Sequence, residues 1–113
     1  MKSYFRYIRG KHGNGIGAVL VRDNGKGEFE IGISICNPKD TFSKTEARKI
    51  ATDYADMSEV YSFYDMIDGD WYADIVDELP HGSNIEDDVY STICNIVHDI
   101  TMDYARAYYK SIA

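Results

Sequence analysis

The sequence feature that most constrains the fold is an alternation of apolar and polar residues between positions 28 and 36. Successive side chains of a β-strand point to opposite faces, so this pattern predicts a strand. The apolar face, which we expect to lie in the core, carries Phe29, Ile31, Ile33 and Ile35. The opposite face, which we expect to lie in water, carries Glu28, Glu30, Gly32 and Ser34.

Two further strands are predicted before this one. Residues 3–9 and 16–22 are rich in aromatic and β-branched residues, which favour strands. Three glycines within residues 10–15 separate them, and Asp23-Asn24-Gly25 supplies the left-handed conformations that a hairpin turn needs. We therefore predict a three-stranded antiparallel meander.

Helical signals follow the meander. Ser43 with Glu46 three residues later has the form of a capping box and predicts a helix start. Apolar residues then recur at helical spacing, and we expect them to cover the apolar face of the sheet: Ala47, Ile50, Ala51 and Tyr54. Residues 57–68 fit either a continued helix or a short strand, and their periodicity does not separate the two.

The second half of the chain predicts further helices. Residues 71–79 have the pattern of a short helix, and Ser83 with Glu86 forms a second capping box. The long helix that follows carries a continuous apolar stripe of Ile85, Val89, Ile93, Ile96, Val97, Ile100, Tyr104 and Tyr108. The length suits one domain. We predict a single α+β domain over residues 1–113, with an N-terminal antiparallel β-meander packed against C-terminal helices, the last one long.

Charge is distributed unevenly along the chain, whose formal net charge is −7. Residues 1–50 contain ten Lys and Arg against five Asp and Glu, a net of +5, and residues 51–113 contain two against fourteen, a net of −12. This asymmetry predicts a basic and an acidic surface on one molecule. The two halves can pair within the fold, pair between subunits, or leave the acidic half exposed to a basic partner.

The basic half contains groups that suit nucleic-acid binding, but the net charge of the chain is negative. Lys2, Arg6 and Arg9 interleave with aromatic residues, a composition that suits such binding. The acidic half would oppose the phosphate attraction that dominates it. We therefore expect no direct nucleic-acid partner.

No set of residues has the makeup of an active site or a metal centre. His12, His81 and His98 are isolated, and the Asp cluster in residues 65–74 lacks the spacing of a calcium loop. The sequence has no Gly-x-Ser-x-Gly elbow. We expect a protein that is not an enzyme and that uses no cofactor and no metal.

The expected compartment follows from the absence of targeting signals. No stretch approaches the roughly 18 consecutive apolar residues of a membrane span. Residues 1–7 lack the apolar region of a signal peptide. We expect the protein to stay in the cytoplasm of the cell that makes it, with no membrane partner.

Aromatic residues are abundant, with ten tyrosines, four phenylalanines and one tryptophan. Tyrosine combines a stacking face with a polar group, which suits interfaces and purines. Arg106 lies among Tyr104, Tyr108 and Tyr109, and a guanidinium beside aromatic faces suits a phosphorylated nucleotide. The alternative is that these tyrosines pack the long helix and a subunit interface.

One segment resembles a known motif. Residues 32–44, Gly-Ile-Ser-Ile-Cys-Asn-Pro-Lys-Asp-Thr-Phe-Ser-Lys, run on into Ala47-Arg-Lys-Ile-Ala51. They are similar to a motif of small bacteriophage accessory proteins, and most of all to the anti-Thoeris signal-sponge family. That resemblance covers the first half of the chain well and the second half only in layout.

The resemblance implies a function. Members of that family have an N-terminal antiparallel sheet and C-terminal helices. They sequester, without cleaving, cyclic ADP-ribose-type signals made by defence TIR proteins, in oligomers with pockets between subunits. This chain is then expected to be a homo-oligomer, a dimer or higher, in the host cell cytoplasm, with cyclic ADP-ribose or another small cyclic nucleotide as its ligand.

The resemblance also implies site residues. Arg106 matches an arginine of the family's last helix that contacts ligand phosphate. Around it we expect aromatic stacking by Trp71 and Tyr108, and recognition of ribose by Asn84 and Asp87. Tyr54 is a departure, because a basic residue is expected after the Ile-Ala pair.

The acidic half of the sequence suggests a second, alternative function. The acidic half could imitate DNA phosphates, which would make the protein an anti-CRISPR-type inhibitor of a nucleic-acid-binding defence enzyme. The dependence of affinity on salt separates the two hypotheses. Binding by DNA mimicry weakens as ionic strength rises, whereas binding of a ligand in an enclosed pocket does not.

Overall fold

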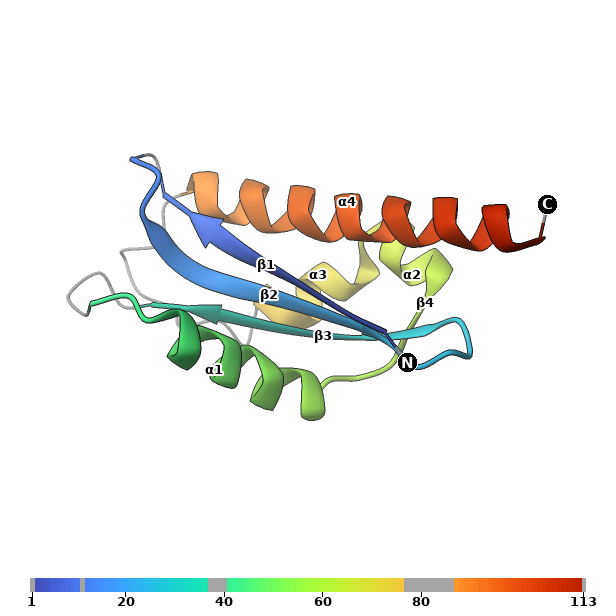
Figure 1. Ribbon diagram of the computed structural model, residues 1–113, viewed down its shortest axis with the longest axis horizontal. Coiled ribbons are helices and arrows are strands. Elements are labelled where there is room, and N and C mark those ends of the chain that lie inside the picture. Colours follow the sequence, from blue (N-terminus) through green and yellow to red (C-terminus); the bar gives the residue numbers. More distant parts are fainter. Residues whose placement is uncertain (1, 11, 37–40, 77–86, 113) are drawn as a thin grey trace.

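The predicted α+β fold is confirmed in the computed structural model, which describes residues 2–10, 12–36, 41–76 and 87–112 (Figure 1). An antiparallel sheet of four strands has the order β1-β2-β3-β4. Its strands are β1 (Lys2–Arg9), β2 (Gly15–Asp23), β3 (Glu28–Ile35) and β4 (Tyr61–Ser62). The helices are α1 (Lys44–Asp56), α2 (Phe63–Asp68), α3 (Asp70–Val76) and α4 (Asp87–Ile112).

The first three strands form the expected meander. Val19 at the middle of β2 lies opposite Arg6 of β1 and Ile33 of β3. A register shift between Ile8 and Arg9 ends the regular pairing of β1. Since β1 pairs only with β2, it is one edge of the sheet.

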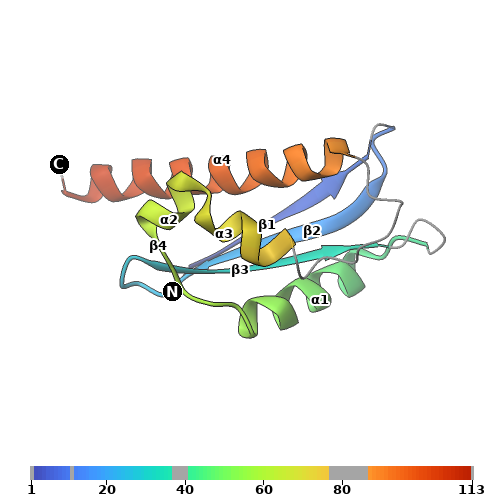
Figure 2. The ribbon, with the colours of Figure 1, turned by 180° about the vertical axis from the view of Figure 1, so that it is seen from behind.

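The α1 helix lies on the face of the sheet opposite to the one we expected. It begins as predicted, with the Ser43 hydroxyl accepting a hydrogen bond from the Glu46 N–H at 3.3 Å. It covers Gly32 and Ser34, the face of β3 that the alternation assigned to water, and the Ser34 hydroxyl donates to the Ala47 carbonyl at 2.8 Å. Both faces of β3 are therefore buried (Figures 1 and 2).

Small side chains explain this placement. The buried stripe of α1 consists of Ala47, Ala51 and Ala55, and it packs on Ala18 and Leu20 of β2. Without large side chains, the helix backbone approaches the sheet closely. The prediction that Ile50 joins the core is wrong: its side chain is 37% exposed, because it points away from that stripe.

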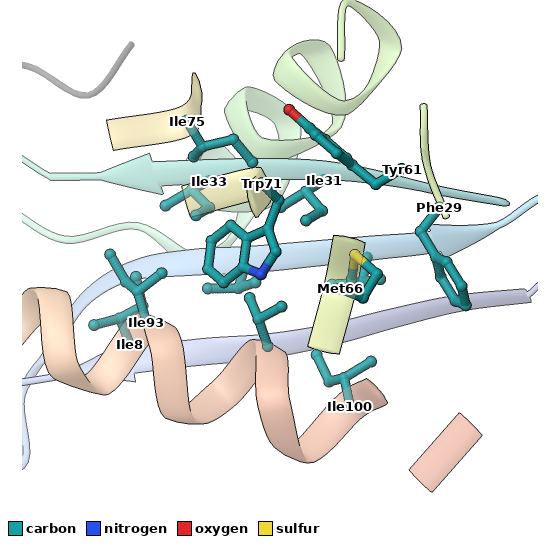
Figure 3. Packing of buried hydrophobic residues seen from close by; sticks show 13 residues of the cluster. Ile8, Phe29, Ile31, Ile33, Tyr61, Met66, Trp71, Ile75, Ile93 and Ile100 are labelled. Atoms are coloured by element: carbon teal, nitrogen blue, oxygen red, sulfur yellow. The ribbon is translucent and has the colours of Figure 1, made fainter. Parts of the chain in front are cut away.

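The other face of the sheet carries the larger core (Figure 3). Phe29, Ile31 and Ile33 of β3 pack there against Trp71 of α3 and Ile100 of α4. Each large apolar side chain buried in this layer contributes about 1.5–3 kcal/mol to stability. Figures 1 and 2 show α4 running along this layer and past the end of the sheet.

The ambiguous segment 57–68 contains a short strand, as one of the two alternatives predicted, and then a new helix, whereas α1 ends at Asp56 and does not continue into it. Tyr61 of β4 pairs with Phe29, and the chain then turns directly into α2. Ser62 and Asp65 form a capping box, with each side chain accepting a hydrogen bond from the other residue's N–H. Gly69, at φ 82°, ends α2 after six residues.

The predicted capping box at Ser83 and Glu86 lies outside the described residues, as does Ile85 at the start of the apolar stripe. The stripe itself is confirmed from Val89 to Tyr104, with Ile93, Val97 and Ile100 fully buried, whereas its last member, Tyr108, is exposed. None of the helices in the described ranges combines the length and the apolar character needed to cross a membrane.

The close approach of α1 is testable at Gly32. A Cβ atom there would overlap the Ala51 carbonyl oxygen, which belongs to the helix backbone and cannot rotate away. We expect Gly32→Ala to lower the free energy of unfolding by about 3 kcal/mol, measured by urea denaturation. Gly25→Ala, at φ 82° but with open space around it, is expected to cost only about 1–2 kcal/mol. Equal losses in the two variants would contradict tight packing at Gly32.

Candidate ligand-binding groove

A groove of about 440 Å³ lies between the β2–β3 hairpin and the C-terminal part of α4. We call it the hairpin groove. Its walls include Asp23, Lys26, Phe63, Tyr104, Tyr108 and Tyr109. Its volume falls in the range of small-molecule sites, which is about 300–1,000 Å³.

The hairpin wall owes its shape to two side chains and two glycines. Asp23 accepts a hydrogen bond from the Gly25 N–H at 2.8 Å, and the Asn24 side-chain oxygen accepts one from the Lys26 N–H at 2.9 Å. Gly25 and Gly27 have φ values of 82° and 75°, which favour glycine. The loop thus places the Lys26 side chain, which is exposed, beside the groove.

The helix wall is a row of aromatic rings. Phe29 of β3 holds Tyr104 edge-on, at 4.9 Å between ring centroids. Tyr104 in turn stacks nearly parallel to Tyr108, one helical turn on, at 6.4 Å and 19°. Tyr109 meets Tyr108 edge-on at 5.7 Å. The buried end of this row is anchored in the core, and Tyr108 and Tyr109 are 52% and 62% exposed.

The surroundings of Tyr104 favour its neutral phenol. Burial raises the pKa of Tyr104, and the negative charge of Asp23 raises it further. A protonated phenol can donate a hydrogen bond as well as accept one. The groove therefore combines flat apolar faces, a hydroxyl donor, a carboxylate and one lysine.

This set of groups suits binding of a planar ring that carries an anionic substituent. The rings offer stacking surfaces, and the Lys26 ammonium offers a charge to a phosphate. Among the described residues, no group of three or more His, Cys, Asp or Glu side chains could hold a metal ion. Burial raises the pKa of the Cys94 thiol on α4, which disfavours the reactive thiolate.

The predicted site residues do not lie together in one pocket of the chain. Tyr108 lines the hairpin groove, as expected for a stacking residue. Arg106 lies on another side of α4, where it is 73% exposed and donates to Asp103 at 2.9 Å. It lines a second, shallow depression with Met102 and Lys110, which adjoins the hairpin groove at Ala105 and Tyr109. Arg106 and Tyr108 therefore do not meet in one pocket of a single chain.

Trp71 and the start of α4 are also apart from the groove. Trp71 is 3% exposed in the core between α3 and the sheet, so its ring is not available to stack on a ligand (Figure 3). Asn84 lies outside the described residues. Asp87 begins α4, about 28 Å from Arg106 at 1.5 Å per residue. A pocket that uses both ends of α4 would need a second subunit.

Several residues of the groove were missed by sequence reasoning. Asp23 and Gly25 were recognised only as turn residues, and Lys26 was not considered. Phe63 lies in the segment whose structure the periodicity left open. The combination of a glycine-rich hairpin with a lysine was the available signal, but only the fold brings it beside Tyr104.

Comparisons with family models, with curated proteins and with solved structures find no match to this chain. The case for function therefore depends on the geometry of the groove and on the motif in residues 32–44.

The raised pKa of Tyr104 predicts how stability depends on pH. Because folding favours the neutral phenol, its contribution is complete below the usual tyrosine pKa of about 10 and is lost as the pH rises through the folded value. We expect the free energy of unfolding, measured by urea denaturation, to fall above about pH 10.

The variant Tyr104→Phe keeps the ring and removes the titrating hydroxyl, so its free energy of unfolding should decline less steeply with pH. Tyr72 and Cys94, whose pKa values are also raised by burial, account for the remaining decline. An unchanged pH profile in Tyr104→Phe would contradict this assignment.

Proposed function

We propose that this protein binds a small nucleotide of the cyclic ADP-ribose type in the hairpin groove and sequesters it without turnover. The observation that carries the proposal is the near-parallel Tyr104–Tyr108 stack facing a hairpin that presents Lys26. Such a wall offers a base a flat surface and its phosphates a cation.

Each part of such a ligand has a partner in the groove. The base stacks on Tyr108 or Tyr109, whose rings are the exposed end of the aromatic row. The phosphates approach Lys26, and ribose hydroxyls donate to the Asp23 carboxylate. Lys26 takes the role that we first assigned to Arg106.

Sequestration needs only tight binding, because a bound signal is removed from its effector by mass action. The resemblance in residues 32–44 supports a bacteriophage anti-defence role in the host cell cytoplasm. Homo-oligomerisation belongs to the same proposal. The C-terminal end of α4 exposes Tyr108, Tyr109 and Ile112, and a second copy packed there would enclose the groove and bring further polar groups to it.

Calorimetric titration with cyclic ADP-ribose tests this proposal. Tyr108→Ala should weaken binding by about tenfold through lost stacking, and Lys26→Ala by about fivefold through lost charge. Tyr64→Ala is the matched control, because Tyr64 is 77% exposed on α2 and does not line the groove. Equal effects of Tyr64→Ala and Tyr108→Ala would exclude the hairpin groove.

A second measurement tests sequestration without cleavage. Protein purified from cells that contain an active TIR enzyme should release intact cyclic nucleotide on heating, identified by mass spectrometry. Accumulation of hydrolysed nucleotide at a rate proportional to protein concentration would show that the protein is an enzyme.

DNA mimicry is the second candidate function, and the surface of α2 and α3 favours it. Asp68 and Asp70 are exposed there, and in the described part of the chain no cation lies within ion-pair distance of either one. Asp74 is exposed on the same helices and accepts a hydrogen bond from the Tyr61 hydroxyl. Capture of a nuclease that is lost steeply as salt rises, with no bound nucleotide, would support this function over the first.

A further inference from the structure

The basic half of the chain divides into paired and unpaired cations. Arg22 forms ion pairs with Asp56 at 2.6 Å and with Glu30 at 3.3 Å. Arg6 lies 3.8 Å from Asp103 of α4. The pairs with Asp56 and Asp103 join the two halves within the fold. In the described ranges, Lys44 and Arg48 of α1 have no carboxylate within ion-pair distance.

Lys44 and Arg48 instead lie over aromatic rings of the edge strand. The Arg48 guanidinium carbon is 4.5 Å from the centroid of Phe5, and the Lys44 ammonium is 5.2 Å from the centroid of Tyr7. Phe42 supports Tyr7 edge-on at 6.4 Å. We call Phe5, Tyr7, Lys44 and Arg48 the basic–aromatic surface.

The two ring–cation pairs repeat with a regular spacing. Phe5 and Tyr7 are two residues apart on β1, hence about 6.6 Å along the strand. Lys44 and Arg48 are four residues apart on α1, hence about 6 Å along the helix. Strand and helix therefore present the same pair of groups twice, at a repeat close to that of an extended nucleic-acid strand.

The surface is open because α1 packs over β2 and β3 and not over the edge strand. Phe5 and Tyr7 remain partly exposed, whereas Ala18 and Leu20 beside them on β2 are buried. Lys44 and Arg48 are exposed. Glu46 lies on the other side of α1, where it lines a cavity with Ile50. Glu46 therefore does not neutralise this surface.

We propose that the basic–aromatic surface binds single-stranded nucleic acid. The two cations contact successive phosphates, and bases stack on the Arg48 guanidinium and on the accessible parts of the two rings. Single-strand-binding proteins combine the same groups, a cationic track and aromatic stacking platforms. This surface lies outside the hairpin groove and is independent of the function proposed for it.

From the sequence alone, the net charge of −7 led us to expect no nucleic-acid partner. In the fold, α2, α3 and α4 carry many of the acidic residues on the other face of the sheet (Figures 1 and 2), although Asp53 and Asp56 lie at the C-terminal end of α1. An acidic protein, or the acidic layer of a second copy, would satisfy the two cations. It would not use the repeated rings beside them, which is why nucleic acid is favoured.

Fluorescence anisotropy with a labelled single-stranded oligonucleotide of mixed sequence, at 20–200 mM salt, tests the proposal. Two phosphate contacts predict a slope of log affinity against log salt of about −1.4. Lys44→Ala should weaken binding several-fold and make the slope shallower by about 0.7. Arg48→Lys keeps the charge and loses the planar group, so it should weaken binding by about fivefold with the slope unchanged. Both side chains are exposed, and circular dichroism will check that the variants fold.

Lys110→Ala near the end of α4 is the control that removes one equivalent charge, and it should leave affinity unchanged. Equal losses in Lys110→Ala and Lys44→Ala would mean that the attraction is non-specific, which overturns the proposal. No binding at 20 mM salt would also overturn it. If Lys44→Ala instead dissolves self-association in sedimentation experiments, the surface is an interface between copies and not a nucleic-acid site.

Discussion

The close contact between α1 and the centre of the sheet is the constraint on which the rest of the structure depends. Gly32 has no side chain, and the helix presents alanines to it, so the two backbones approach until a Cβ atom would not fit. This contact buries the second face of β3. The large apolar side chains of β3 are left for the opposite layer, where α2, α3 and α4 pack.

The same contact determines which surfaces remain for partners. Because α1 is centred on β2 and β3, the edge strand keeps two aromatic rings accessible beside Lys44 and Arg48. On the opposite face, α4 extends past the sheet and forms a groove with the hairpin. The sheet thus separates a basic surface from a largely acidic layer, and a molecule of net negative charge retains a local cationic face.

The tyrosines of α4 lie in two different environments. Tyr104 is anchored against Phe29 and Phe63 and belongs to the core. Tyr108 continues the row into solvent, where a ring on a rigid helix can stack on a ligand with little loss of side-chain entropy. A single helical stripe therefore passes from packing to exposure within one turn, at the point where α4 leaves the sheet.

Most of the local structure could be predicted from neighbouring residues alone, with residues 57–68 as the exception. Alternation gave the strands of the meander, Asp23-Asn24-Gly25 gave the hairpin, and the 3.6-residue period gave α1 and α4, because these signals depend on neighbouring residues. Sequence could not assign α1 to a face of the sheet, since that choice rests on the fit of Gly32 to Ala51, which are 19 positions apart. Nor could it show that Trp71 is core, whereas the placement of Arg106 and Tyr108 on different sides of α4 follows from their two-residue spacing on the predicted helix. Only the tertiary structure brought Lys26 of the hairpin beside the rings of α4, because the packing of distant elements decides which surface residues become neighbours.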